Sequence, residues 1–253
     1  MSLKVGGNTV LITGGATGIG FALAEAFADA GSEVILCGRR RSKLQQAKTK
    51  LPKAHVRKCD VSVESERRKL LRWITVNFPR TDMLVNNAGI QRQVDFTSHK
   101  IVKNTLSADD ELAINLEATI RLCALFAPKF MRKKTAAIVN ISSGLAFVPI
   151  AEMPIYCATK AAIHSFTISL RRQLRDTPVR VFEAIPPTTD TELDASFAGK
   201  DEEAYRGISP QEVAAAIIDG VREDKQEIVI GQAQGLQKAA MKDPQLIFNR
   251  LNH

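Results

Sequence analysis

The chain has 253 residues, of which 45% are hydrophobic and 25% charged, as is typical of a soluble globular protein with one large or two small domains. It lacks an apolar run near the ~18 residues of a membrane span and lacks a signal pattern at its start, so we expect an intracellular, cytoplasmic protein. The net charge of +8 is spread among acidic residues on predicted helix faces, at positions such as Lys43, Arg67 and Arg171. We interpret most of it as solvated surface rather than as a nucleic-acid site, with one exception described below.

The cysteines and histidines show no metal-ligand spacing. Four of each are present, they are scattered along the chain, and the cysteines form no CxxC pair. We therefore predict no metal site, and we predict buried thiols rather than disulfides. The cysteines concerned are Cys37, Cys59, Cys123 and Cys157.

The first elements form a recognisable unit. A short apolar strand at residues 9–12 leads into a turn with Gly14, Gly18 and Gly20, and an amphipathic helix then ends near Gly31. A second strand follows at residues 33–37. Strand, glycine turn, helix and strand begin a dinucleotide-binding unit, in which glycines let the backbone approach a pyrophosphate closely. The helix N-terminus offers its unpaired N–H groups to the phosphates.

The end of the second strand indicates which dinucleotide binds. An NAD site usually has an acidic residue there for the ribose hydroxyls, but this chain has Gly38-Arg39-Arg40-Arg41. An arginine can pair with a 2′-phosphate, so we predict NADP rather than NAD and assign that contact to Arg39. The alternative is that the arginines only begin a solvated helix, which is the interpretation we favour for Arg40 and Arg41.

The remaining pattern alternates strands and helices without repeats or a linker, so it predicts one α/β domain over residues 1–253. We expect a Rossmann-type, doubly wound, mostly parallel sheet of seven strands with helices on both faces. The further strands are predicted at 54–59, 82–85, 136–141, 179–185 and 227–230, and the further helices at 42–51, 63–78, 109–131, 154–175 and 210–221.

Several loops and polar residues leave alternatives open. Asp60, at a strand end, could accept from an adenine amino group or cap the next helix. Asn115 lies in an apolar helix, where it could make a structural hydrogen bond or order a water behind Lys160. Residues 192–207 could be a substrate flap or a plain surface loop. Residues 91–106 could rim the site, and the tail at 232–253 could pack on the surface or on another subunit.

The stretch from Asn140 to Lys160 carries the candidate chemistry. Tyr156 and Lys160 are four residues apart on a predicted helix, so they share one face. A free tyrosine titrates near ~10, and an ammonium within ~4–6 Å can lower that pKa by ~1–3 units. With Ser142 and Ser143 at the preceding strand end, the arrangement predicts proton transfer to or from an alcohol/carbonyl pair.

The motifs together resemble the short-chain dehydrogenase/reductase family over roughly residues 5 to 231. They are the Thr13–Gly20 turn, Asn86-Asn87-Ala88-Gly89, Asn115, Ser143 and Tyr156-x-x-x-Lys160. The run from Ser142 to Pro149 also looks like bacterial DltE-type oxidoreductases, whose substrate the sequence does not reveal.

The resemblance implies an oxidoreductase that acts on a small carbonyl or alcohol substrate with NADP, and a homodimer or homotetramer. Tyr156 would be the acid/base, Lys160 would lower its pKa and hold the nicotinamide ribose, Ser143 would orient the reacting oxygen, and Asn115 would support a relay water. The implied cofactor contacts are Gly14, Thr17, Gly18, Ile19, Gly20, Arg39, Asp60, Val61, Asn87, Ala88, Gly89, Tyr156, Lys160 and Thr191. The rival hypothesis is a non-catalytic dinucleotide sensor on the same fold.

Two positions depart from the family pattern. Pro187 stands where the family usually has glycine after the sixth strand, which removes an N–H and fixes φ. We therefore expect the loop up to Thr191 to follow its own path. Thr17 stands where NADP-preferring members often have a basic residue, which counts slightly against NADP.

Overall fold

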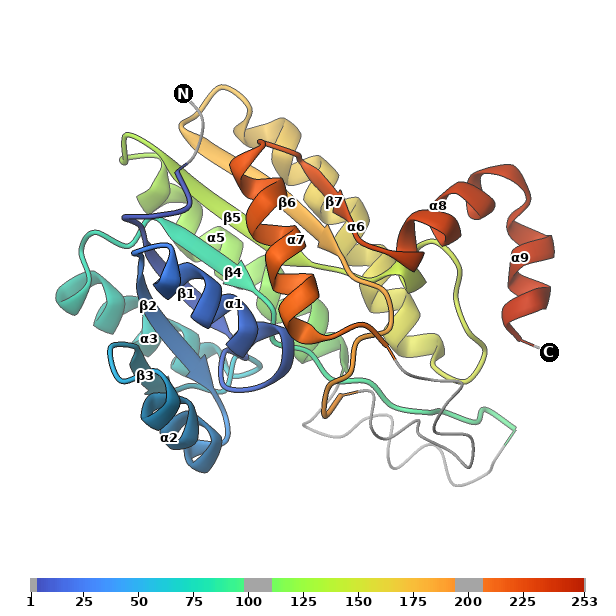
Figure 1. The fold of residues 1–253 in the computed structure, drawn as a ribbon, viewed down its shortest axis with the longest axis horizontal. Helices are drawn as coiled ribbons and strands as arrows, with labels where there is room; N and C mark the ends of the chain where they lie inside the picture. Colours follow the sequence, from blue (N-terminus) through green and yellow to red (C-terminus); the bar gives the residue numbers. More distant parts are fainter. Residues whose placement is uncertain (1–3, 98–110, 194–206, 253) are drawn as a thin grey trace.

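A seven-stranded sheet, parallel throughout, is the centre of the computed structural model, which describes residues 4–97, 111–193 and 207–252 (Figure 1). Its order is β3-β2-β1-β4-β5-β6-β7, so the chain changes direction across the sheet between β1 and β4. Ligands of such sheets bind at the carboxyl ends of the strands beside that point. The strands are β1 Thr9–Thr13, β2 Glu33–Gly38, β3 His55–Lys58, β4 Met83–Asn86, β5 Ala136–Ile141, β6 Val179–Ile185 and β7 Glu227–Val229.

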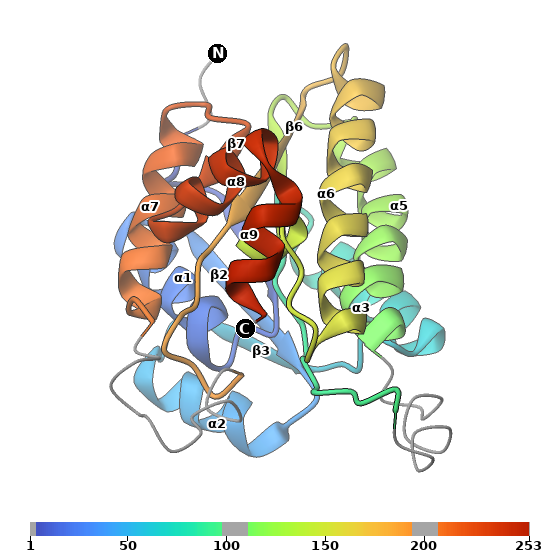
Figure 2. The ribbon, with the colours of Figure 1, turned by 90° about the vertical axis from the view of Figure 1, so that its right-hand side faces the viewer.

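Helices cover both faces of the sheet and bury two separate cores (Figure 2). Successive side chains of β1 point to opposite faces of the sheet, so Val10 and Ile12 pack in one core and Leu11 packs in the other. The fold class predicted from the sequence is thereby confirmed. One face carries α1 Gly18–Asp29, α2 Arg41–Lys50 and α7 Pro210–Arg222, and the other carries α3 Glu64–Asn77, α5 Ala118–Phe130 and α6 Pro154–Leu174.

The long helix predicted at 109–131 begins differently from the prediction. Within the described residues it opens as a π-helical segment, η1 Leu112–Glu117, and continues as α5. Such segments are rare and occur frequently at functional sites. Asn115 lies in this one, and hydrophobic periodicity gave no sign of the change in helix type.

The C-terminal tail forms two helices, α8 Gln232–Lys242 and α9 Pro244–Leu251. The side chain of Asn252 accepts from the Ala151 N–H and donates to the Pro149 carbonyl (3.3 Å). A Cβ on Gly144 would lie 3.2 Å from that of Ala233, so α8 packs closely on the short 3₁₀ helix η2 Gly144–Ala146. The tail therefore packs on this chain's own surface.

Some predictions lie partly outside the described residues. Most of the predicted flap (194–206) and part of the predicted rim (98–106) are there, as is the start of the helix at 109. Within the described ranges, no helix combines the length and the hydropathy that crossing a membrane requires. All four cysteines are buried and free, as predicted.

The interpretation of Arg67 and Arg171 as solvated charge is wrong. Arg67 is 2% exposed and donates to the Val61 carbonyl at 2.6 Å. Arg171 donates to the carbonyls of Val181 (3.0 Å) and Gln226 (2.8 Å). The Arg67 guanidinium satisfies a buried backbone acceptor, and that of Arg171 satisfies one half-buried and one exposed acceptor. Helix periodicity cannot distinguish this role from that of a solvated face.

Candidate active site

The glycine turn after β1 is tied to the segment after β4. The N–H groups of Asn87 and Ala88 both donate to Thr13 Oγ1 at 3.0 Å, and Asn87 Nδ2 donates to the Thr13 carbonyl at 3.0 Å. A Cβ on Gly14, whose φ is +62°, would lie 2.9 Å from Ala88 Cα. One on Gly20 would lie 2.5 Å from Asn87 Nδ2. Only glycine fits this close approach of two strand ends.

A cavity of about 380 Å³ opens over this turn. Most of the predicted cofactor residues line it: Gly14, Thr17, Gly18, Ile19, Arg39, Asp60, Val61, Asn87, Ala88, Gly89 and Thr191. Gly20, Tyr156 and Lys160 are not in its lining, although a Cβ on Gly89 would lie 3.9 Å from Lys160 Nζ. The cavity thus ends beside the candidate catalytic residues.

The N-terminus of α1 is suited to a pyrophosphate. Thr17 is its N-cap but makes no capping hydrogen bond with its side chain, so the N–H groups of the first turn are left for another acceptor. Those groups and the positive end of the helix dipole favour an anion. Gly18 and Ile19 of this first turn line the cavity, and their N–H groups fit the pyrophosphate of a dinucleotide.

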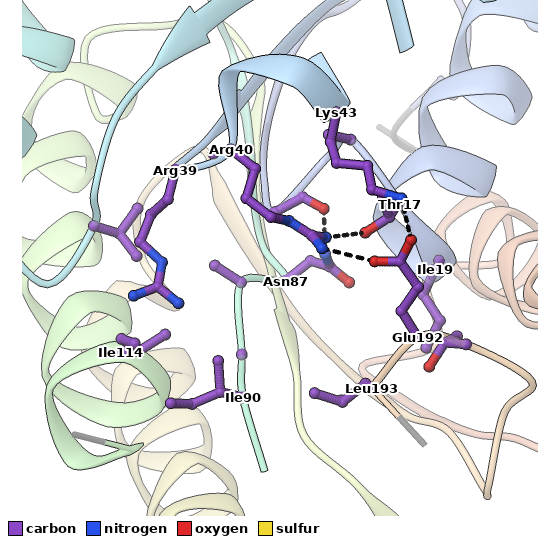
Figure 3. A pocket seen from close by; sticks show the side chains of 18 of the residues that line it. Thr17, Ile19, Arg39, Arg40, Lys43, Asn87, Ile90, Ile114, Glu192 and Leu193 are labelled. Atoms are coloured by element: carbon purple, nitrogen blue, oxygen red, sulfur yellow. Dashed lines mark hydrogen bonds and ion pairs between the residues drawn. The ribbon is translucent and has the colours of Figure 1, made fainter. Parts of the chain in front are cut away.

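Sequence reasoning missed a cation cluster at one end of the cavity (Figure 3). Arg40 Nη1 lies 2.7 Å from Glu192 Oε2, and Arg40 Nη2 donates to Thr17 Oγ1 at 3.2 Å. Lys43 Nζ donates to the other carboxylate oxygen of Glu192. The hydrogen bonds from Lys43 and then Arg40 hold the pKa of Glu192 below its usual range.

Arg40 is the N-cap of α2 and is 56% exposed, as expected for a residue that begins a solvated helix, but Arg40 and Lys43 also pair with Glu192 at the cavity. The missed signal was their spacing, since residues three apart in the first turn of a helix lie on one face. Arg39 lies across the cavity from Arg40 and points toward Ile114 (Figure 3).

Asp60 borders the cavity but does not cap α3. The N-cap of that helix is Val63, so the capping alternative is wrong. The Asp60 carboxylate instead accepts from the N–H (2.9 Å) and the hydroxyl (2.6 Å) of Ser62. With Arg67 on the Val61 carbonyl, these bonds fix the Asp60-Val61 wall from behind.

Tyr156 and Lys160 are both buried on the inward face of α6. Lys160 Nζ lies 5.5 Å from the centroid of the Tyr156 ring and donates to the Ile141 carbonyl at 2.9 Å. Burial lowers the pKa of Lys160 to about 8, and the charge of Glu183 opposes that shift. An ammonium this close can stabilise a phenolate.

The two serines after β5 have different surroundings. Ser142 donates to the fully buried Glu183 carboxylate at 2.6 Å, and His164 Nδ1 lies 2.9 Å from the same carboxylate. Ser143 is the N-cap of η2 and accepts from the Leu145 N–H at 3.1 Å. Ser142 is therefore occupied in a buried network, which favours Ser143 as the substrate-side hydroxyl.

The Asn115 side chain joins η1 to the segment after β4. Its Oδ1 accepts from the Ile90 N–H (2.9 Å), and its Nδ2 donates to the Ile90 carbonyl (2.8 Å) and to Thr159 Oγ1 (3.1 Å). The structural alternative for Asn115 is thus present. A water relay behind Lys160 stays a prediction.

The segment after β6 reaches the cavity through Thr191. A Cβ on Gly18 would lie 3.1 Å from Thr191 Cγ2, and the Leu193 carbonyl accepts from Gln91 at 2.9 Å. Pro187 has no N–H to donate, but Thr189 pairs with Ile208 in a parallel bridge. The residues after Pro187 are therefore held in place by a second segment of the chain.

Comparisons with known proteins agree with this geometry. The family model described as short chain dehydrogenase matches residues 8–202. The relative named "Uncharacterized oxidoreductase DltE", from Bacillus subtilis, is 45% identical over 250 residues, which are 99% of this chain and 98% of that protein.

Solved structures show the same fold. A short chain dehydrogenase from Burkholderia cenocepacia in complex with NADP has a TM-score of 0.84 at 24% identity, covering 98% of this chain and 99% of that one. A short chain dehydrogenase/reductase from Burkholderia phymatum in complex with NAD has a TM-score of 0.83 at 22% identity, covering 97% and 96%. One binds NADP and the other NAD, so the likeness does not decide between the cofactors.

Proposed function

The chain belongs to the short chain dehydrogenase family of oxidoreductases, and from that premise we propose that it transfers hydride between NADP(H) and a secondary alcohol or ketone. The observation that carries the proposal is the buried Lys160 ammonium, 5.5 Å from the Tyr156 ring and beside Gly89 at the edge of the cavity. A sensor of cofactor state has no need of that acid/base pair.

The cavity lining supports NADP(H) as the cofactor. Three cations (Arg39, Arg40 and Lys43) line the cavity directly after β2, where an NAD site usually has a carboxylate. The first turn of α1 would hold the pyrophosphate, and Lys160 the nicotinamide ribose. When bound, NADP(H) supplies or accepts the hydride.

The chain's own residues would move the proton. In reduction, Tyr156 donates its phenolic proton to the substrate oxygen as that oxygen gains negative charge, and an alcohol forms. The phenolate left behind is stabilised by Lys160 and takes a proton back from water. Oxidation runs the same steps in reverse. Ser143 holds the reacting oxygen by a hydrogen bond.

The substrate side is apolar. Met153, Tyr156 and Cys157 form a small buried cluster against which Leu145 and Ile150 pack. Apolar walls around a few polar groups suit a ketone or alcohol with a hydrocarbon substituent. The α8 helix packs on η2, so the tail would border this substrate side.

The test is a panel of ketones with NADPH, and of secondary alcohols with NADP, for wild type and Tyr156→Phe. We expect wild type to turn over at least one pair, and the variant to lose turnover by about 10²–10⁴-fold while its affinity for NADPH stays within about twofold. The phenylalanine keeps the packing but has no proton to give. Wild-type rates in the variant would rule out this mechanism.

A further inference from the structure

The Glu192 carboxylate occupies an anion site made by other residues. Each of its oxygens contacts a different cation, Arg40 or Lys43, and the same guanidinium donates to Thr17 Oγ1 (Figure 3). Arg40 is 56% exposed and Glu192 49% exposed, and ion pairs at such exposure contribute only ~0.2–1 kcal/mol. A competing anion can therefore displace the carboxylate readily.

The position of this site matches one part of a dinucleotide. Arg40 is the N-cap of α2 and Lys43 lies in its first turn, directly beyond the end of β2 at Gly38. Dinucleotide-binding folds place the adenosine ribose 2′ position there. A phosphate carries more negative charge and more acceptor oxygens than a carboxylate, so it suits the two cations better.

On the basis of the proposed NADP(H) function, we propose that Arg40 and Lys43 bind the 2′-phosphate and that Glu192 is an internal competitor for the same cations. Binding of NADP(H) breaks the contacts of Glu192, whereas NAD(H) has no 2′-phosphate and leaves them in place. Arg40 and Lys43 would therefore make most of the 2′-phosphate contact that was predicted for Arg39, because Arg39 points toward Ile114 (Figure 3).

The role of Thr17 follows from the same contacts. It stands where similar NADP-preferring sequences have a basic residue, and here the Arg40 guanidinium lies 3.2 Å from its hydroxyl. The helix α2 thus brings a positive charge to the place where the glycine turn lacks one. Sequence comparison at position 17 alone does not show that Arg40 supplies the positive charge there.

The experiment measures dissociation constants by calorimetry for NADPH, NADH, adenosine 2′,5′-bisphosphate and ADP. Three proteins are compared: wild type, Glu192→Gln, and the double variant Arg40→Ala/Lys43→Ala. We expect Glu192→Gln to bind the two 2′-phosphate ligands about fivefold more tightly, with ADP and NADH within about twofold. We expect the double variant to lose at least about tenfold in affinity for the 2′-phosphate ligands only.

Matched controls are Arg41→Ala, an exposed arginine in the same helix turn that does not line the cavity, and Arg39→Ala. The first should change no affinity, and the second should weaken ligands with and without the 2′-phosphate alike. A loss in Arg41→Ala equal to that of the double variant, or a Glu192→Gln that binds all four ligands like wild type, would overturn the proposal. Glu192→Ala repeats the test should the first variant fold poorly.

The outcomes also separate this inference from the proposed function. Preference for NADPH in wild type that Glu192→Gln leaves unchanged would overturn the competitor and keep the oxidoreductase with its cofactor. Equal binding of NADPH and NADH by wild type would overturn the NADP preference together with the anion site. Turnover of a ketone by wild type but not by Tyr156→Phe tests the chemistry independently of both.

Discussion

Lys160 and Lys43 carry the same ammonium group at two ends of the candidate site, in opposite surroundings. Lys160 is 5% exposed and donates to a backbone carbonyl, and burial lowers its pKa to about 8. Lys43 is 32% exposed at its side chain and pairs with a carboxylate that water also reaches. Burial destabilises the charged form of a lysine and brings its pKa toward neutral pH. A solvent-exposed lysine stays charged at little energetic cost, and its weak ion pair can be replaced by another anion. The first lysine suits proton chemistry and the second suits reversible binding.

The largest expected effect follows from removing the buried charge. We predict that Lys160→Met lowers turnover by about 10²–10³-fold, because Tyr156 loses the ammonium that stabilises its phenolate. Lys43→Met should keep turnover at saturating NADPH and raise only the Michaelis constant for that cofactor. Steady-state kinetics of the two variants measures both. Equal losses of turnover would remove the distinction between the two lysines.

The variant that loses more turnover, Lys160→Met, should nevertheless be the more stable of the two. A lysine whose folded pKa is about 8, against 10.5 unfolded, destabilises the fold by roughly 3 kcal/mol below pH 8, and this penalty fades as pH rises to 10.5. After subtracting about 1 kcal/mol for the hydrogen bond to Ile141, Lys160→Met should be more stable at pH 7 by on the order of 2 kcal/mol. Denaturant unfolding at pH 7 and pH 10.5 checks the sign, with Lys43→Met near zero at both. A gain that does not shrink at pH 10.5 would contradict the assignment.

Salt should separate the exposed cations from the buried one. Raising ionic strength from about 0.05 M to about 0.5 M shortens the screening length, so the preference for NADPH over NADH should fall several-fold. Turnover of the saturated enzyme should change little, because Lys160 is shielded from solvent ions. Paired cofactor titrations and initial rates at each salt concentration measure this. A preference independent of salt would argue against a phosphate held by Arg40 and Lys43.

Glu183 offers a finer test of the buried lysine. Its charge raises the pKa of Lys160 against the effect of burial, so Glu183→Gln should lower that pKa further. The alkaline limb of the kcat/KM profile should then move to lower pH, because the ammonium is lost earlier. Glutamine can still accept from Ser142, and Glu227→Gln is the control on the neighbouring strand. A shift to higher pH would contradict the electrostatic role.

The smallest effect is expected at Pro187. Its carbonyl accepts from Thr189 Oγ1 at 2.9 Å, and the following residues are held by the bridge to Ile208. Pro187→Gly restores the family residue, and we predict a loss of stability of about 0.5–1 kcal/mol from added freedom in the unfolded chain. Activity should stay within about twofold of wild type. A large gain in activity would show that the proline distorts the loop up to Thr191.

The sequence determined much of the fold and half of the site. The strand at 136–141 and the strand at 179–185 were predicted to the residue, because parallel strands buried on both faces are mostly apolar runs. The helix predicted from residue 210 does begin there as α7, and a capping box between Ser209 and Glu212 defines that start. Glycine spacing located the dinucleotide turn, since local backbone geometry allows few other residues there.

Tertiary structure decided what depends on which elements meet. Arg67 and Arg171 have the pattern of surface helix charges, and they become buried and half-buried, respectively, only because of what packs over them. Asn115, in the π-helical turn, exchanges two hydrogen bonds with the backbone of Ile90, which lies on another segment. Glu192 reaches Arg40 and Lys43 only because the segment after β6 runs back to the glycine turn, where Thr191 lies beside Gly18. Local sequence encodes periodicity and turn geometry, whereas partners distant in the chain are fixed by the sheet order, and that is where the cation site arises.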